Sequence, residues 1–96
     1  MMTLNEVTSN ASYKPRNPER KFETILANGN NLECSISDWG SGYSIGSFGI
    51  SGLTKNGKRW HCFFSHEAIP TIFSRETIKA CNEMRSLVLK MIEDLK

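Results

Sequence analysis

Several features that would indicate a particular biochemistry are missing from this sequence of 96 residues. Its three cysteines are an odd number and none belongs to a CxxC pair, the usual spacing of structural zinc ligands. No apolar run approaches the ~18 residues that a membrane-spanning helix needs. The formal net charge of +2 is close to neutral. It therefore gives no general attraction to nucleic acid or to a membrane surface.

The start of the chain also lacks a charged segment followed by an apolar one, so no secretory signal is predicted. The expected location is the reducing cytoplasm, where Cys34, Cys62 and Cys81 would be thiols that pack as small apolar side chains. The composition, with 39% hydrophobic and 23% charged residues, is that of an ordinary globular domain. The length predicts one domain with a modest core.

Residues 1–19 are expected to form a flexible arm, and residues 20–96 a single domain. The arm is polar, lacks hydrophobic periodicity and contains Pro15 and Pro18. Residues 14–21 carry four cations and one carboxylate. This stretch is either a solvated tail or an arm that contacts an acidic partner or a phosphate backbone.

Two Asn-Gly pairs divide the central part of the chain into two predicted hairpins. The four strands are expected at residues 21–27, 31–38, 44–53 and 58–65. At Asn56-Gly57 a type I′ turn is expected, because Asn and Gly most readily adopt the positive φ that both central residues of that turn need. A bulge is expected near Gly46, since Ile45 is out of phase with Phe48 and one extra residue would cause this.

Ser74 is expected to cap a helix that begins at Arg75 and continues for about 20 residues. Apolar side chains recur there at spacings of three and four, at Ile78, Cys81, Met84, Val88, Met91 and Leu95. The predicted fold is α+β: a four-stranded antiparallel sheet of two hairpins, covered on one face by this helix. On the last strand, Trp60, Cys62 and Phe64 are expected to face the helix, and Arg59, His61 and Phe63 the open side.

Motifs for catalysis or metal binding are weak. Residues 42–46 match GxSxG, but that nucleophile elbow requires a strand-to-helix turn in a parallel sheet. His61 and Cys62 are adjacent in a strand and point to opposite faces, so they cannot bind one ion together. No catalytic residue, cofactor or metal is predicted, and the chain is not expected to be an enzyme.

The candidate contact surface combines basic and aromatic side chains. It comprises Trp39, Tyr43, Lys55, Lys58, Arg59, His61 and Phe63. Such residues are enriched at protein-protein hot spots, and they also suit the stacking of bases and the neutralisation of phosphates. The alternative is that Trp39 and Tyr43 pack on the core and that the lysines keep the turn soluble.

In size and general style, residues 20–96 resemble small bacteriophage accessory proteins, such as the anti-RecBCD proteins of lambdoid phages. Those proteins bind a host exonuclease and redirect it toward phage recombination. The resemblance includes no diagnostic motif, so it implies no functional residue. It implies a modulator or inhibitor that docks on a larger host protein of the nuclease, recombination or defence machinery, in the host cytoplasm.

Two functions therefore stay open. The first is a protein-binding modulator, and the second is a domain that binds single-stranded nucleic acid through the same face and the arm. The near-neutral charge favours the first, because nucleic-acid binders usually carry a larger basic excess. A homodimer is also compatible with Phe63 on an open sheet face. No membrane partner is expected.

Overall fold

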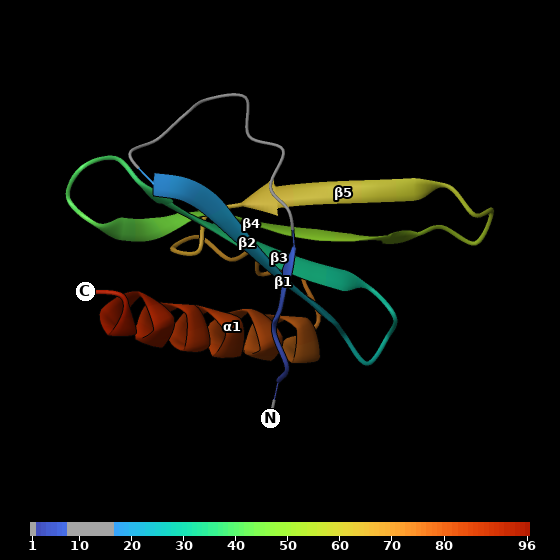
Figure 1. The fold of residues 1–96 in the computed structure, drawn as a ribbon. Coiled ribbons are helices and arrows are strands. Elements are labelled where there is room, and N and C mark those ends of the chain that lie inside the picture. Colours follow the sequence, from blue (N-terminus) through green and yellow to red (C-terminus); the bar gives the residue numbers. More distant parts are fainter. Residues whose placement is uncertain (1, 8–16) are drawn as a thin grey trace.

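A sheet and a helix form the two layers of this protein, as Figure 1 shows for the computed structural model. The structure describes residues 2–7 and 17–96, and the remainder of the expected arm lies outside them. The elements are β1 (Asn5–Val7), β2 (Asn17–Ile25), β3 (Asn31–Asp38), β4 (Tyr43–Leu53), β5 (Arg59–Phe64) and α1 (Arg75–Asp94). The strands are antiparallel and lie in chain order. The predicted α+β class, with an antiparallel sheet and a C-terminal helix, is confirmed.

The prediction of four strands is wrong, because the sheet has a fifth strand at its edge. This strand, β1, lies in the segment expected to be an arm and pairs with β2 from Asn5–Glu23 to Val7–Lys21. A strand of three residues is too short to show an alternating pattern, so its sequence carries no periodic signal. Strand β2 also begins at Asn17, before the alternation that predicted it.

The two predicted hairpins, β2–β3 and β4–β5, each close with a three-residue loop. In the second, the Thr54 N–H donates to the Lys58 carbonyl (2.8 Å) and the Gly57 N–H to the Thr54 carbonyl (2.9 Å). Gly57 has a φ of 81°, but no non-glycine residue in the described part of the chain has a positive φ. The expected type I′ turn is therefore wrong. With three loop residues, Gly57 alone needs the left-handed conformation, as in a type I turn followed by a G1 bulge.

The bulge predicted in β4 is confirmed. The register between β3 and β4 shifts between Cys34 and Ile36, so that Gly46 and Ser47 lie opposite a single residue of β3. The alternation of side chains restarts after the extra residue. Odd-numbered residues of β4 therefore face the helix before the bulge and the open side after it, which places Tyr43 on the helix side.

The core lies between the sheet and α1. Its buried side chains are Phe22, Leu32, Cys34, Ile36, Phe48 and Ile50 from the sheet, and Cys81, Met84, Val88 and Ile92 from the helix. Of the apolar residues predicted to face the sheet from the helix, Cys81, Met84 and Val88 are confirmed as buried. At the end of the helix Ile92 is buried and Leu95 is exposed, because Leu95 is the C-cap and lies beyond the last helical residue.

The start of α1 follows the prediction. Ser74 has an extended backbone, and its Oγ accepts a hydrogen bond from the Thr77 N–H at 3.2 Å. Glu76 lies in the first turn, where the helix dipole favours a negative charge. Among the described residues, no helix is both long enough and apolar enough to cross a membrane.

Candidate binding surface

The seven residues predicted to bind a partner lie in two places. Five of them, from Lys55 to Phe63, belong to the hairpin of β4 and β5. Trp39 and Tyr43 lie where the chain enters β4, and Figure 1 shows this loop and the hairpin tip at opposite ends of the sheet. The ten residue steps from Tyr43 to Leu53 cover ~33 Å at ~3.3 Å per residue. The two groups are thus too far apart for one small site.

On the open face of the sheet, Phe63 lies across the backbone of Gly49. A Cβ at Gly49 would be 3.0 Å from Cδ1 and Cε1 of Phe63 and 2.9 Å from Oε1 of Glu33. The φ of Gly49 is not positive, so the backbone conformation does not require glycine here. Its lack of a side chain instead leaves room for the ring of Phe63.

Exposed apolar and aromatic side chains also lie along the same face of the hairpin, from this contact towards the tip. Phe63 is 65% exposed and stacks on His61, with ring centroids 6.0 Å apart and planes 8° apart. Leu53, which pairs with Arg59 across the strands, is 66% exposed. We call Leu53, Arg59, His61 and Phe63 the hairpin patch. Apolar side chains exposed together in this way are typical of interaction sites.

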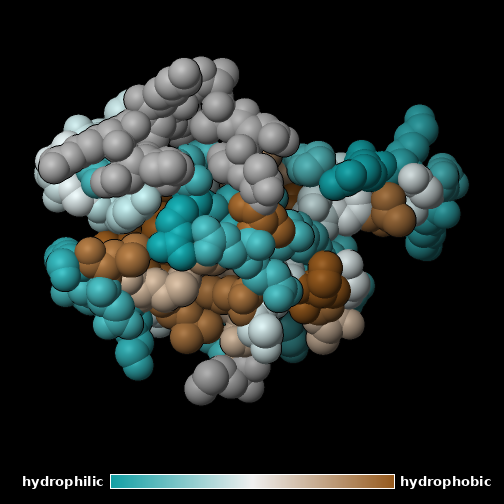
Figure 2. Space-filling model, viewed as in Figure 1, coloured by the Kyte–Doolittle hydropathy of each residue, from teal (hydrophilic) through white to brown (hydrophobic). Residues whose placement is uncertain are grey.

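The tip of the hairpin is basic. Lys55, Lys58 and Arg59 are all exposed, and residues 39–66 contain no carboxylate. Figure 2 shows the hairpin projecting from the body of the molecule, with hydrophilic residues at its tip. The projection makes the patch accessible to a large partner.

The centre of the open face is acidic in contrast. Glu33 lies beside Gly49 and forms an ion pair with Lys21 (Nζ to Oε2, 2.9 Å). Glu23, opposite Glu33 on β2, accepts a hydrogen bond from Asn31 Nδ2 at 3.1 Å. A ligand with many negative charges would therefore meet carboxylates as soon as it extended from β5 towards β2.

Trp39 and Tyr43 have different surroundings. Trp39 is 65% exposed, in a loop that Asp38 orders by accepting hydrogen bonds from the N–H groups of Gly40 (2.8 Å) and Gly42 (3.2 Å). Tyr43 is half-buried and packs at the margin of the core. The structure therefore does not bring either residue to the hairpin patch.

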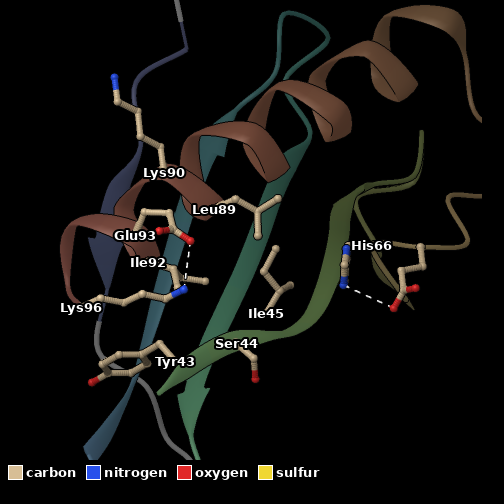
Figure 3. A pocket seen from close by; sticks show the side chains of 10 residues that line it. Tyr43, Ser44, Ile45, His66, Leu89, Lys90, Ile92, Glu93 and Lys96 are labelled. Atoms are coloured by element: carbon tan, nitrogen blue, oxygen red, sulfur yellow. Dashed lines mark hydrogen bonds and ion pairs between the residues drawn. The ribbon is translucent and has the colours of Figure 1, made fainter. Parts of the chain in front are cut away.

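Tyr43 lines a hollow of about 680 Å³ between the start of β4, the end of α1 and the segment after β5. Figure 3 shows Ile45, Leu89 and Ile92 around it, with ion pairs at its rim. They join Lys96 to Glu93 (3.0 Å) and, when His66 is protonated, His66 to Glu67 (3.7 Å). The hollow draws on three separate segments, so no local sequence pattern could indicate it. Two lysines and two glutamates line it, so it has no excess of either charge.

The cysteines differ in accessibility. Cys34 and Cys81 are buried, and burial raises the pKa of Cys34 to about 12 and that of Cys81 to about 11. Such thiols stay protonated near neutral pH and are poor nucleophiles. Cys62 is half-buried on the edge strand. Within the described part of the chain, no three His, Cys, Asp or Glu side chains come together as metal ligands would.

No protein-family model, no curated protein and no solved structure matches this chain. The geometry of the hairpin patch, with the physical chemistry of its side chains, is what bears on function.

Proposed function

We propose that this chain is a non-enzymatic binding module that docks on a larger protein through the hairpin patch. The observation that carries the proposal is the exposed stack of Phe63 on His61, on a hairpin that projects from the domain. Covering an apolar side chain of this size stabilises a complex by roughly 1.5–3 kcal/mol. Aromatic and arginine side chains are also those that most often dominate binding energy.

The charges around the patch indicate what the partner surface should be. Lys55, Lys58 and Arg59 lie at the tip end of the patch, and the hairpin has no carboxylate to neutralise them. A partner with an apolar pocket and an acidic rim would complement this arrangement. Complementary charges at a rim mainly accelerate association and select the orientation of docking.

Binding of single-stranded nucleic acid is the second candidate, supported by the same stacked rings and the three cations of the tip. Two observations favour a protein instead. The net charge is only +2, and the row of Phe63 continues across the sheet to Glu33, which Lys21 neutralises, and then to Glu23, whose carboxylate would repel phosphates.

For the partner, we propose a component of host nuclease, recombination or defence machinery, so that the chain acts as a phage-type modulator or inhibitor in the host cytoplasm. The support is the resemblance in size and general style to small phage accessory proteins.

The test is capture from bacterial lysate on the tagged chain, with and without nuclease, read by mass spectrometry. The wild type should retain one stoichiometric protein after nuclease treatment. Phe63→Ala should lose it, because removal of a hot-spot ring costs about 2 kcal/mol, roughly 30-fold in affinity. The matched control is Ile72→Ala, which removes an apolar side chain that is 91% exposed outside the patch.

Three results would contradict the proposal in different ways. Capture that vanishes with nuclease would favour nucleic-acid binding at the Lys55–Arg59 tip. Equal capture by Phe63→Ala and Ile72→Ala would reject the hairpin patch as the site. Capture that Trp39→Ala abolishes but Phe63→Ala leaves intact would move the site to the opposite end of β4.

A further inference from the structure

One edge of strand β5 has no neighbouring strand among the residues that the structure describes. This strand is the last of the sheet and pairs with β4 alone among the described elements. The Thr54 N–H donates to the Lys58 carbonyl, so the backbone groups of Lys58 point towards β4. Along β5, the direction of the backbone N–H and C=O groups alternates from this residue onward. Backbone groups of Trp60, Cys62 and Phe64 then point towards β4, and those of the odd-numbered residues 59–63 point to the free edge.

This edge lacks most of the features that keep free strands from pairing, which are short length, proline, bulges and inward-facing charge. The opposite edge strand, β1, has three residues. Strand β5 has six, with the sequence RWHCFF. Its register with β4 continues without a shift from Leu53–Arg59 to Phe48–Phe64. An edge that is both long and apolar is a ready template for another strand.

We propose that a second copy of this chain covers the edge, with the two β5 strands antiparallel about a two-fold axis at Cys62. The strand is nearly symmetric in chemistry about this residue. In this register His61 lies opposite the second copy's Phe63, and Trp60 opposite the second copy's Phe64. Each aromatic side chain thereby gains an aromatic partner, a favourable kind of cross-strand pair. The outward backbone groups of His61 and Phe63 also face one another, as a hydrogen-bonded ladder requires.

Charge favours the same orientation. The hairpin carries Lys58 and Arg59 at the start of β5, and the exposed Glu67 follows its end. In the antiparallel arrangement, the basic start of one β5 lies beside the end of the other β5, close to Glu67. In a parallel arrangement, the two basic starts would lie beside each other. The two basic tips would point in opposite directions.

The joined sheet would have ten strands and a longer binding surface. On the open face, the stacks of His61 and Phe63 from both copies would form one cluster of four rings. The dimer concerns the edge of β5 and forms from the chain alone, so it does not depend on the proposed function. A single pair of strands is a small interface, and dissociation on the order of micromolar is expected.

The first test is sedimentation velocity of the full chain over a series of concentrations, from about 0.1 to about 100 times the expected dissociation constant. The wild type should change from one copy to two. His61→Pro removes an N–H that faces the free edge, a position that proline tolerates, and should weaken the dimer at least about tenfold. The control His61→Thr loses the same ring but keeps the N–H and favours strands, so its dimer should be at least about tenfold tighter than that of His61→Pro.

Cys62 provides an independent test of the register. Opposite residues of a non-hydrogen-bonded antiparallel pair have Cα atoms about 4.5 Å apart, within the range of a disulfide. Oxidised glutathione should join the two Cys62 thiols and be reduced to two molecules of glutathione. Non-reducing electrophoresis should show the linked dimer forming at least about ten times faster above the dissociation constant than below it. The Cys62→Ser variant should form no disulfide-linked dimer.

A chain that stays single at all concentrations would overturn the proposal. So would a dimer that is unaffected by His61→Pro, or one in which Cys62 does not cross-link. If His61→Pro fails to fold by circular dichroism, the cross-linking of the wild type decides alone. If a host protein binds a single copy and slows amide hydrogen exchange along β5, then a strand of that partner, rather than a second copy, covers this edge.

Discussion

The ring of Phe63 occupies the space in which a side chain at Gly49 would lie, so these two residues of neighbouring strands fit only as a pair. We predict that Gly49→Ala lowers the free energy of unfolding by about 1 kcal/mol, because the added methyl displaces the ring. Urea denaturation measures this. In a Phe63→Ala background the same change should cost less than about 0.5 kcal/mol. Equal costs in both backgrounds would show that the pair is not coupled.

The cap of α1 gives a second prediction. Ser74→Ala removes the oxygen that accepts from the Thr77 N–H and should destabilise the protein by about 1 kcal/mol. Ser86→Ala is the matched control, since Ser86 is exposed in the helix interior, where alanine is the better helix former. Thermal unfolding should show a lower midpoint for the first variant and an unchanged or higher one for the second.

Strand β1 should respond to acid. The Arg20 guanidinium donates to Glu6 (Nε to Oε2, 2.9 Å; Nη2 to Oε1, 2.8 Å), and this holds the pKa of Glu6 below its ordinary value. A carboxyl group whose pKa is lower in the folded state stabilises that state fully above its unfolded pKa of about 4.3. The contribution is lost as the pH falls through the folded-state pKa. Because both side chains are partly exposed, we expect the ion pair to contribute less than about 1 kcal/mol to the free energy of unfolding.

Amide hydrogen exchange of β1, followed from pH 6 to pH 3 by nuclear magnetic resonance and corrected for the intrinsic rate, would measure this loss of pairing. Glu6→Gln should weaken β1 at pH 6 and remove most of the dependence on pH. A pH dependence that persists unchanged in Glu6→Gln would assign the effect to another carboxyl group.

The three thiols should react in a fixed order. At pH 8 and low protein concentration, a disulfide reagent should modify Cys62 first, because it is half-buried on an edge strand. Cys34 and Cys81, buried and with raised pKa values, should react only after denaturant is added. Cys62→Ser should abolish the fast phase. A fast phase that survives this change would mean that the core opens readily.

The elements that the sequence predicted well are those with strong local signals. The Asn-Gly pairs located both hairpins, and the three-four spacing from Cys81 to Val88 located the helix. The turn type failed because loop length, and not the dipeptide alone, decides which residues need a positive φ. Strand β1 could not be predicted, since its three residues are too few to show an alternating pattern.

The candidate site was predicted in part. Alternation along β5 correctly placed Arg59, His61 and Phe63 on the open face. The bulge at Gly46 reverses the side on which Tyr43 lies, and it separates that residue from the hairpin patch. The fit of Phe63 over Gly49 depends on the register between β4 and β5, and the sequence pattern of either strand alone does not show it.

The order of the strands in the sheet is also their order along the chain, and this has a consequence for how the protein folds. Each strand can pair with the one made just before it, and from β2 to β5 closing the sheet requires only short loops and little loss of chain entropy. Proteins dominated by such local pairings fold quickly. The slowest step should then be the docking of α1, whose packing joins the twenty residues Arg75–Asp94 to strands formed much earlier. A nascent chain would expose the apolar inner face of its sheet until this helix has left the ribosome.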